Sequence, residues 1–545
     1  MRHDTGPSAD RPIPAAAVLC RLMELTFTQR LLAQSLAVLT LLRWFLAGLH
    51  DISPAEAQLV ETLRHPSLAG LEGGNLTAWL AGVGTFVFGD SPFGVRFAAP
   101  LLMAGSSWML YRLAHSLTGE KTAGWAVALF NLTPMANLAA VQMRPETPGI
   151  FFLIAGMVSV WRGLRRASPW DWHWPLAGML FGLGFLCWYG AVWGLAGTLL
   201  LLAGSRRWRG LLRRPGPWLM VADFALFAWP VWDWNRSHAG AAYFFWRDAV
   251  RPPEQGWQWS GPLVQAGQWL LMVSPVMFAA MLWALFQAVK QWRASDAARF
   301  ITVMALPPLA AAWLASLSAG PRPAWLAPAF PALCLLLPWA WENHLADLRR
   351  KTQLQWLCVL PALVVTPLVL DTDLLRHAGV PLTYRHDQSR NWRGWRTVAK
   401  EAEEIIRSAA PQSPGGLFVI AQDARLASVL NFHLPPGLPL LRPTPRHPLV
   451  MTPSGPVPES DYHFWPDYNG QSEGKNAFEG RTALYFTTSQ ADAPPPRVRR
   501  LFGGCQPLTV FDVVQRGLPL RRIRVFGCHD YKGGVGPAGV ALGGG

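Results

Sequence analysis

The chain has 545 residues, of which 51% are hydrophobic and only 15% are charged, and it contains 29 tryptophans. This composition argues against a soluble enzyme of several domains and indicates a membrane protein. The formal net charge of +15 is compatible with nucleic-acid binding, but membrane proteins also collect Lys and Arg in cytoplasmic loops, so the positions of the basic residues must decide.

The N-terminal segment, residues 1–30, mixes Asp, Arg and Pro and lacks a compact apolar core that ends at a small-residue cleavage site. No cleavable signal peptide is therefore expected. We expect this segment to lie in the cytoplasm.

Apolar segments of about 20 residues, the length that crosses a bilayer, recur over the first two thirds of the chain. Examples are "LLAQSLAVLTLLRWFLAGL" and "LLMVSPVMFAAMLWALFQAV". Their recurrence disfavours the alternative of core helices in a large soluble protein. Residues 31–370 are therefore predicted to form an α-helical polytopic membrane domain with about eleven transmembrane helices. The expected spans are 31–49, 93–117, 123–141, 147–161, 174–187, 189–204, 217–234, 265–288, 300–318, 325–341 and 354–370.

Basic residues concentrate in the loops on one side of these spans, in "WRGLRR", "SRRWRGLLRR", "KQWRASDAAR" and "ADLRRK". The positive-inside rule places these loops in the cytoplasm. The loops 50–92 and 235–261 and the short loop "MRPETP" then lie outside. This reading predicts membrane lipids, and no nucleic acid, as partners.

From about Asp371 onward the sequence takes the character of a soluble domain. The segment "NWRGWRTVAKEAEEIIRSAA" carries an apolar helical stripe, "GLFVIAQD" and "RTALYFTT" are typical of short strands, and "LTVFDVVQ" and "LPLRRIRVF" flank a turn. We predict a small extracytoplasmic α/β domain over 371–532, followed by a flexible Gly-rich tail, 533–545.

Four of the six cysteines, Cys20, Cys187, Cys334 and Cys358, show no metal-ligand spacing, and a requirement for a divalent metal stays open. Cys505 and Cys528 could pair in an oxidising compartment, or they could remain free thiols; the sequence leaves both open.

Several motifs resemble one family in order and spacing. "HDISPAEAQ" and "LTAWLAGVGTFVFGDSPFGVRFAAPLL" are followed by "MRPETPGIFF", "WPVWDWNRSH", "WLAPAFPAL" and the distal "FWPDYNG", "GKNAF" and "ALYFTT". They look like the corresponding segments of bacterial members of the dolichyl-phosphate-mannose protein mannosyltransferase superfamily, glycosyltransferase family 39. The resemblance implies a C-type glycosyltransferase fold in the bacterial inner membrane. It also implies transfer of a sugar from a polyprenyl-phosphate donor to an extracytoplasmic lipid, glycan or protein.

Such chemistry needs a carboxylate that takes the proton of the acceptor hydroxyl, and donors that stabilise the lipid phosphate. In the family the usual base is the first acidic residue of a D-E pair, and here that position is Ala55. The resemblance leaves Glu56, Asp51 and Glu146 as catalytic candidates. For Asp51 the alternative is the cap of a helix that starts after Pro54.

Two other positions depart from the family. The triplet "GGN", which starts at Gly73, replaces K-G-P or H-P-P, and Trp188 replaces a lysine that could meet a phosphate. The candidate substrate-binding residues are Arg144, Arg64, His65, Tyr189, Asn235, His238, Arg322 and Trp325. For each of them an ordinary structural or solvated role remains the alternative, and an interfacial Trp is common in membrane proteins.

The leading hypothesis is a membrane glycosyltransferase that uses a polyprenyl-phosphate sugar. The three departures keep open a catalytically silent relative that binds a lipid-linked sugar or a partner enzyme. A secondary transporter is disfavoured, because no internal repeat is evident.

Overall fold

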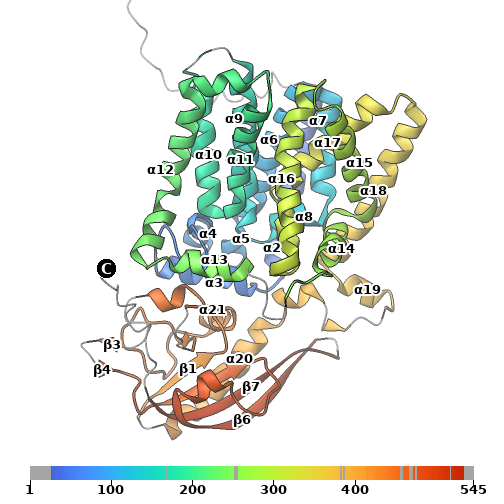
Figure 1. Ribbon diagram of the computed structural model, residues 1–545. Coiled ribbons are helices and arrows are strands. Elements are labelled where there is room, and N and C mark those ends of the chain that lie inside the picture. Colours follow the sequence, from blue (N-terminus) through green and yellow to red (C-terminus); the bar gives the residue numbers. More distant parts are fainter. Residues whose placement is uncertain are drawn as a thin grey trace, which may run out of the picture.

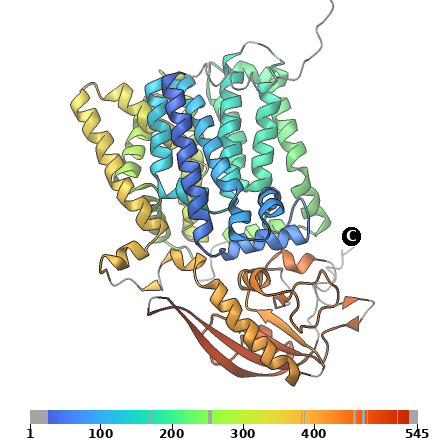
Figure 2. The ribbon, with the colours of Figure 1, turned by 180° about the vertical axis from the view of Figure 1, so that it is seen from behind.

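The computed structural model describes residues 26–532 except 167, 169, 251–255, 381–382, 385–386, 414, 454–457, 466–470, 473–474 and 516. The predicted Gly-rich tail, most of the N-terminal segment and Cys20 lie outside the described residues. A helical bundle occupies one end of the molecule and a mixed α/β domain the other, in both views (Figure 1, Figure 2).

Every predicted span coincides with one helix or with a pair of consecutive helices. The helices are α2 (Phe27–Leu49), α5 (Pro92–Arg96), α6 (Ala98–Thr118), α7 (Glu120–Leu132), α8 (Pro134–Val141), α9 (Glu146–Arg165), α10 (His173–Cys187), α11 (Val192–Gly204), α12 (Pro215–Ser237), α14 (Gly261–Val273), α15 (Pro275–Lys290), α16 (Asp296–Ala319), α17 (Phe330–His344) and α18 (Leu348–Leu370). The predicted class, a polytopic helical protein, is confirmed.

Fewer helices have the length and composition of a membrane span than the eleven expected. Among the described residues four helices are long and apolar enough to cross a membrane, or up to six if each bent pair is one span. The pairs α7–α8 and α14–α15 bend by 67° and 108°, and α10 is shorter than a full span. Pro134 and Pro275 begin the second helix of each pair, where a missing N–H costs least.

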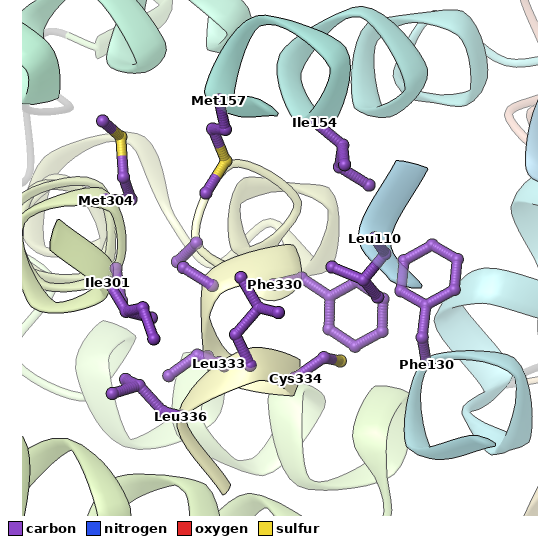
Figure 3. Packing of buried hydrophobic residues seen from close by; sticks show 14 of the residues in the cluster. Leu110, Phe130, Ile154, Met157, Ile301, Met304, Phe330, Leu333, Cys334 and Leu336 are labelled. Carbon is purple, nitrogen blue, oxygen red and sulfur yellow. The ribbon is translucent and has the colours of Figure 1, made fainter. Parts of the chain in front are cut away.

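The core of the bundle is built on α9 and α17, whose apolar residues are buried almost all round. Figure 3 shows Leu110, Phe130, Ile154, Met157, Ile301, Met304, Phe330, Leu333, Cys334 and Leu336 packed together from α6, α7, α9, α16 and α17. By contrast, α2 and α18 expose large apolar side chains such as Phe45 and Val364, as expected for helices that face lipid.

The C-terminal domain contains a five-stranded sheet in the order β2-β1-β5-β7-β6. Its strands are β1 (Leu417–Ala421), β2 (Val450–Met451), β5 (Thr482–Thr487), β6 (Phe502–Gln515) and β7 (Leu518–Tyr531). The strand β1 is parallel to β2 and β5, whereas β7 is antiparallel to β5 and β6. A separate pair consists of β3 (Gln471–Ser472) and β4 (Lys475–Asn476).

The predicted helix, strands and hairpin of this domain all form. Helix α20 (Trp395–Ala409) buries Val398, Ala402 and Ile406. The hairpin β6–β7 places Cys505 opposite Cys528, and the two form a disulfide.

Two short helices of the predicted outer loop 50–92 lie where the bundle meets the domain. These are α3 (Pro54–Arg64) and α4 (Leu76–Phe88), and α3 packs against α21 (Ala424–His433) of the domain (Figure 1). Helix α13 (Ala241–Val250), from the second predicted outer loop, lies at the same level (Figure 1). Both predicted outer loops therefore reach the face of the bundle that carries the C-terminal domain.

Candidate active site

A cavity of about 600 Å³, the junction cavity, opens where the bundle, α3 and the C-terminal domain meet. Its walls combine small apolar residues of α16 with polar and aromatic residues of the loops. Its lining includes Ala55, Gln58, Glu72, Gly73, Glu146, Trp188, Tyr189, Trp193, Trp246, Ala312, Ala315, Arg322, Trp325 and Asp461. The structure therefore brings together four predicted site residues, Glu146, Tyr189, Arg322 and Trp325.

Glu146 lies in the first turn of α9, where a carboxylate is favoured by the helix dipole. Its Oε2 accepts a hydrogen bond from Arg144 Nε at 3.3 Å, and 14% of the Glu146 side chain is exposed. Arg144 itself is 40% exposed and does not line the cavity. Arg144 therefore contacts the site through Glu146.

Arg322 precedes a short 3₁₀ helix, η3 (Pro323–Leu326), and its backbone is fixed by Gln265. The Gln265 amide accepts from Arg322 N at 2.7 Å and donates to Arg322 O at 3.1 Å. The guanidinium carbon lies 5.2 Å from the ring centre of Trp325, within cation–π range. This wall of the cavity thus presents a cation beside an aromatic face.

The three departures from the family, Ala55, Gly73 and Trp188, line this same cavity. Gly73 adopts φ +141°, and a Cβ there would lie 3.0 Å from a ring carbon of Tyr189. Position 73 therefore accommodates glycine because Tyr189 occupies the space of a larger side chain. Trp188 covers Gly149 and Gly190 in the same way.

Glu56 does not line the junction cavity, contrary to its expected place as a base. Its carboxylate is fully buried and accepts hydrogen bonds from Arg96, from Ser53 N at 3.0 Å and from Met143 N at 3.0 Å. Burial acts to raise the pKa of Glu56, but the charge and hydrogen bonds of Arg96 and Ser53 outweigh burial and lower the pKa. A carboxylate so enclosed is a structural anchor and a poor proton acceptor.

Asp51 also lies outside the lining of the cavity, and the cap of α3 is Ser53, not Asp51. The Asp51 carboxylate instead reaches the C-terminal domain. It accepts from Trp395 N at 3.1 Å and pairs with Arg396 Nε at 3.1 Å. Asp51 therefore joins the bundle to the start of α20.

A second cavity of about 570 Å³, the domain cavity, lies between the loop after α3, the end of α12 and the C-terminal domain. It is lined in part by Arg64, His65, Trp234, Arg446, His447, Asp461, Phe464 and Trp465. The His65 ring stacks on Trp465 with centroids 3.8 Å apart, and burial lowers the pKa of His65. Arg64 is bound to Glu61 at 2.6 Å and to Asp90 at 3.1 Å.

Asn235 and His238 line neither cavity. Asn235 Oδ1 accepts from Tyr243 N at 3.1 Å, which ties α12 to α13. The His238 ring stacks on Trp234 and meets Phe464 edge-on. Both residues therefore shape the turn beside the domain cavity.

Sequence reasoning missed two carboxylates of the junction cavity, Glu72 and Asp461. Glu72 is exposed to the cavity, and its carbonyl accepts from the Trp246 indole at 3.2 Å. Loss of hydration within the cavity raises the pKa of the Glu72 carboxyl, and the negative charge of Asp461 raises it by a smaller amount. Asp461 comes from the distal domain, and the only signal was its place just before "FWPDYNG". Among the described residues no group of three or more His, Cys, Asp or Glu is placed to hold a metal ion.

Comparisons with known proteins agree with this architecture. Residues 73–234 match the family described as dolichyl-phosphate-mannose-protein mannosyltransferase, which confirms over this segment the resemblance that the motifs indicate. The structure of ArnT from Cupriavidus metallidurans bound to undecaprenyl phosphate superposes with a TM-score of 0.55 at 14% identity. The superposition covers 92% of this chain and 98% of that one, and it shows the fold.

Two curated relatives are similar over part of the chain. The undecaprenyl phosphate-α-4-amino-4-deoxy-L-arabinose arabinosyl transferase of Pseudomonas paraeruginosa is 28% identical over 48% of this chain and 48% of its own length. The lipid A galacturonosyltransferase RgtD of Rhizobium johnstonii is 24% identical over 48% of this chain and 55% of its own length. The matches thus span about half the length of these relatives.

Proposed function

We propose that this chain transfers a sugar from a polyprenyl-phosphate donor to an acceptor on the extracytoplasmic side of the bacterial inner membrane. The observation that carries the proposal is the junction cavity, in which Arg322 and a set of carboxylates meet at the end of an apolar bundle. The names of the curated relatives support a sugar carried on undecaprenyl phosphate and an acceptor of the lipid A type.

In the proposed reaction the donor phosphate lies beside Arg322, whose fork of N–H groups suits phosphate oxygens. The small side chains of Ala312 and Ala315 leave room for the first isoprene units, while Trp193, Trp246 and Trp325 provide aromatic faces for the sugar. Attack on the anomeric carbon breaks its bond to the phosphate oxygen, and the charge that develops on the lipid phosphate is stabilised by Arg322.

Glu146 is proposed to hold the sugar by accepting hydrogen bonds from its hydroxyl or amino groups. The described lining contains three carboxylates, on Glu72, Glu146 and Asp461, and one arginine. This balance favours a sugar that carries a cationic group over an anionic one. Glu56 and Asp51 are proposed to position α3 and the C-terminal domain.

The membrane orientation is part of the proposal. A disulfide between Cys505 and Cys528 fits an oxidising compartment, and the basic loops between α11 and α12, α15 and α16, and α17 and α18 lie at the other end of the bundle (Figure 1). Thiol alkylation in intact cells should therefore leave Cys505 and Cys528 unmodified until a reductant is added.

The activity is tested with purified protein, membrane acceptors and a set of radiolabelled undecaprenyl-phosphate sugars that includes an amino sugar and a uronic acid. We expect transfer, with the amino sugar preferred, and a transfer rate at least about 10-fold lower for Glu146→Gln, which loses charge-assisted hydrogen bonds to the sugar. The matched control is Glu404→Gln, an exposed position on α20. Binding of donors without transfer of any would instead favour the catalytically silent relative, which Ala55, Gly73 and Trp188 keep as the second candidate.

A further inference from the structure

Among the residues that the structure describes, Asp461 is the carboxylate that lines both cavities. It belongs to a short 3₁₀ turn of the C-terminal domain, η7 (Asp461–Phe464), and projects toward the loop after α3. Its Oδ1 accepts a hydrogen bond from Leu71 N at 2.5 Å. Gly70 makes this approach possible, because a Cβ at position 70 would lie only 2.5 Å from Oδ1.

This position is the one that a general base requires. The base must touch the acceptor while the acceptor touches the anomeric carbon of the donor. Glu146 and Glu72 line the junction cavity but not the domain cavity. An acceptor in the domain cavity and a donor in the junction cavity would meet at Asp461.

The chain also lacks a base where the family resemblance places one. Ala55 has no titratable group, and the carboxylate of the neighbouring Glu56 is enclosed by Arg96, Ser53 and Met143. Ala55 and Asp461 line the same junction cavity. A carboxylate from the distal domain thus reaches the cavity in which position 55 carries none.

We propose that Asp461 is the general base of the transfer and replaces the carboxylate that position 55 lacks. The inference rests on the proposed function and deepens it. The acceptor hydroxyl oxygen forms a bond to the anomeric carbon as the bond from that carbon to the phosphate oxygen breaks. The hydroxyl proton passes to Asp461 Oδ2, and the electron pair of the broken bond leaves on the polyprenyl phosphate.

The surroundings of Asp461 suit this role. Burial raises the pKa of its carboxyl, against smaller effects of the Leu71 hydrogen bond and the charge of His238, which lower it. A carboxylate with a raised pKa is a stronger base than an exposed one. Among the described residues, Leu71 N is the one hydrogen-bond donor to Asp461, and it binds Oδ1.

The decisive variant is Asp461→Asn, which keeps an oxygen for the Leu71 N–H but cannot take a proton. We expect the rate per folded molecule to fall about 10²- to 10⁴-fold, with donor binding and the unfolding temperature unchanged. The matched control is Glu459→Gln, two positions away, where the exposed carboxylate pairs with Arg497 outside both cavities. This control should keep the wild-type rate.

Restoration of the missing carboxylate gives a second readout. We expect Ala55→Asp to recover a measurable part of the activity in the Asp461→Asn background, because a carboxylate at position 55 enters the same cavity. Near-wild-type transfer by Asp461→Asn would overturn the assignment of the base and leave the proposed function standing. Wild-type protein that binds donors and transfers none would overturn the proposed function itself.

Discussion

Glu56 and Arg96 form a bidentate ion pair that is closed to solvent. Arg96 Nε and Nη2 each lie 2.7 Å from one carboxylate oxygen, and both side chains are at most 2% exposed. Arg96 also donates to the carbonyls of Ala47, His50 and Asp51. One pair therefore ties the end of α2 and the start of α3 to α5.

Removal of one partner should leave the other charge buried and unpaired. We expect Glu56→Ala to lower the free energy of unfolding by about 3–5 kcal/mol. The exposed pair of Glu403 and Arg407 on α20 provides the comparison, and Glu403→Ala should cost less than about 1 kcal/mol. Thermal unfolding in detergent measures both. A Glu56→Ala protein as stable as the Glu403→Ala control would contradict the anchoring role.

The Asp51 carboxylate should hold the C-terminal domain against the bundle. Asp51→Ala removes the acceptor for Trp395 N and the partner of Arg396, at the first turn of α20. Loss of a side-chain acceptor at the first turn of a helix, as at an N-cap, costs about 1 kcal/mol. We expect faster amide exchange at the start of α20, measured by mass spectrometry, while Asp512→Ala on the hairpin leaves it unchanged. Equal exchange in both variants would show that Asp51 does not fix the domain.

Glu61 should make stability depend on pH. Burial raises its pKa to about 7, against the opposing charge and hydrogen bond of Arg64, and Asp90 raises it slightly further. Because the unfolded chain has the ordinary pKa of 4.5, the folded protein holds an extra proton between about pH 4.5 and 7. The free energy of unfolding therefore falls as the pH rises through this window, by roughly 3 kcal/mol.

The variant Glu61→Gln should flatten this dependence, because an amide does not titrate. The unfolding temperature at pH 5, 6, 7 and 8 provides the measurement, with Glu403→Gln as a control that keeps the wild-type slope. An unchanged slope in Glu61→Gln would assign the pH dependence to other groups.

Local patterns predicted the elements of the fold but not the partners of the buried charges. The apolar stripe on α20 and the hairpin depend on short-range periodicity, and both appear where the sequence placed them, whereas the pairing of Cys505 with Cys528 was left open by the sequence. Glu56 was predicted to be catalytic because no local pattern reveals its ion pair with Arg96, which lies 40 positions away in the chain. Asp461 was not predicted as a site residue, because only the packing of the distal domain against the bundle brings it to Leu71, 390 positions away in the chain.

Four of the predicted site residues share one cavity, and Arg322 is the one among them that carries a positive charge. Arg322→Ala should raise the KM for the polyprenyl-phosphate donor roughly 10- to 100-fold, the value of a charge-assisted hydrogen bond of about 1.5–3 kcal/mol. The KM of Arg322→Lys should lie between those of the wild type and Arg322→Ala, because an ammonium keeps the charge but not the planar fork. Both substitutions retain the two hydrogen bonds with Gln265, since these involve only the Arg322 backbone. Arg407→Ala, on the exposed face of α20, is the control for a general loss of positive charge. If Arg322→Ala and Arg407→Ala give the same KM for the donor, the phosphate is bound elsewhere.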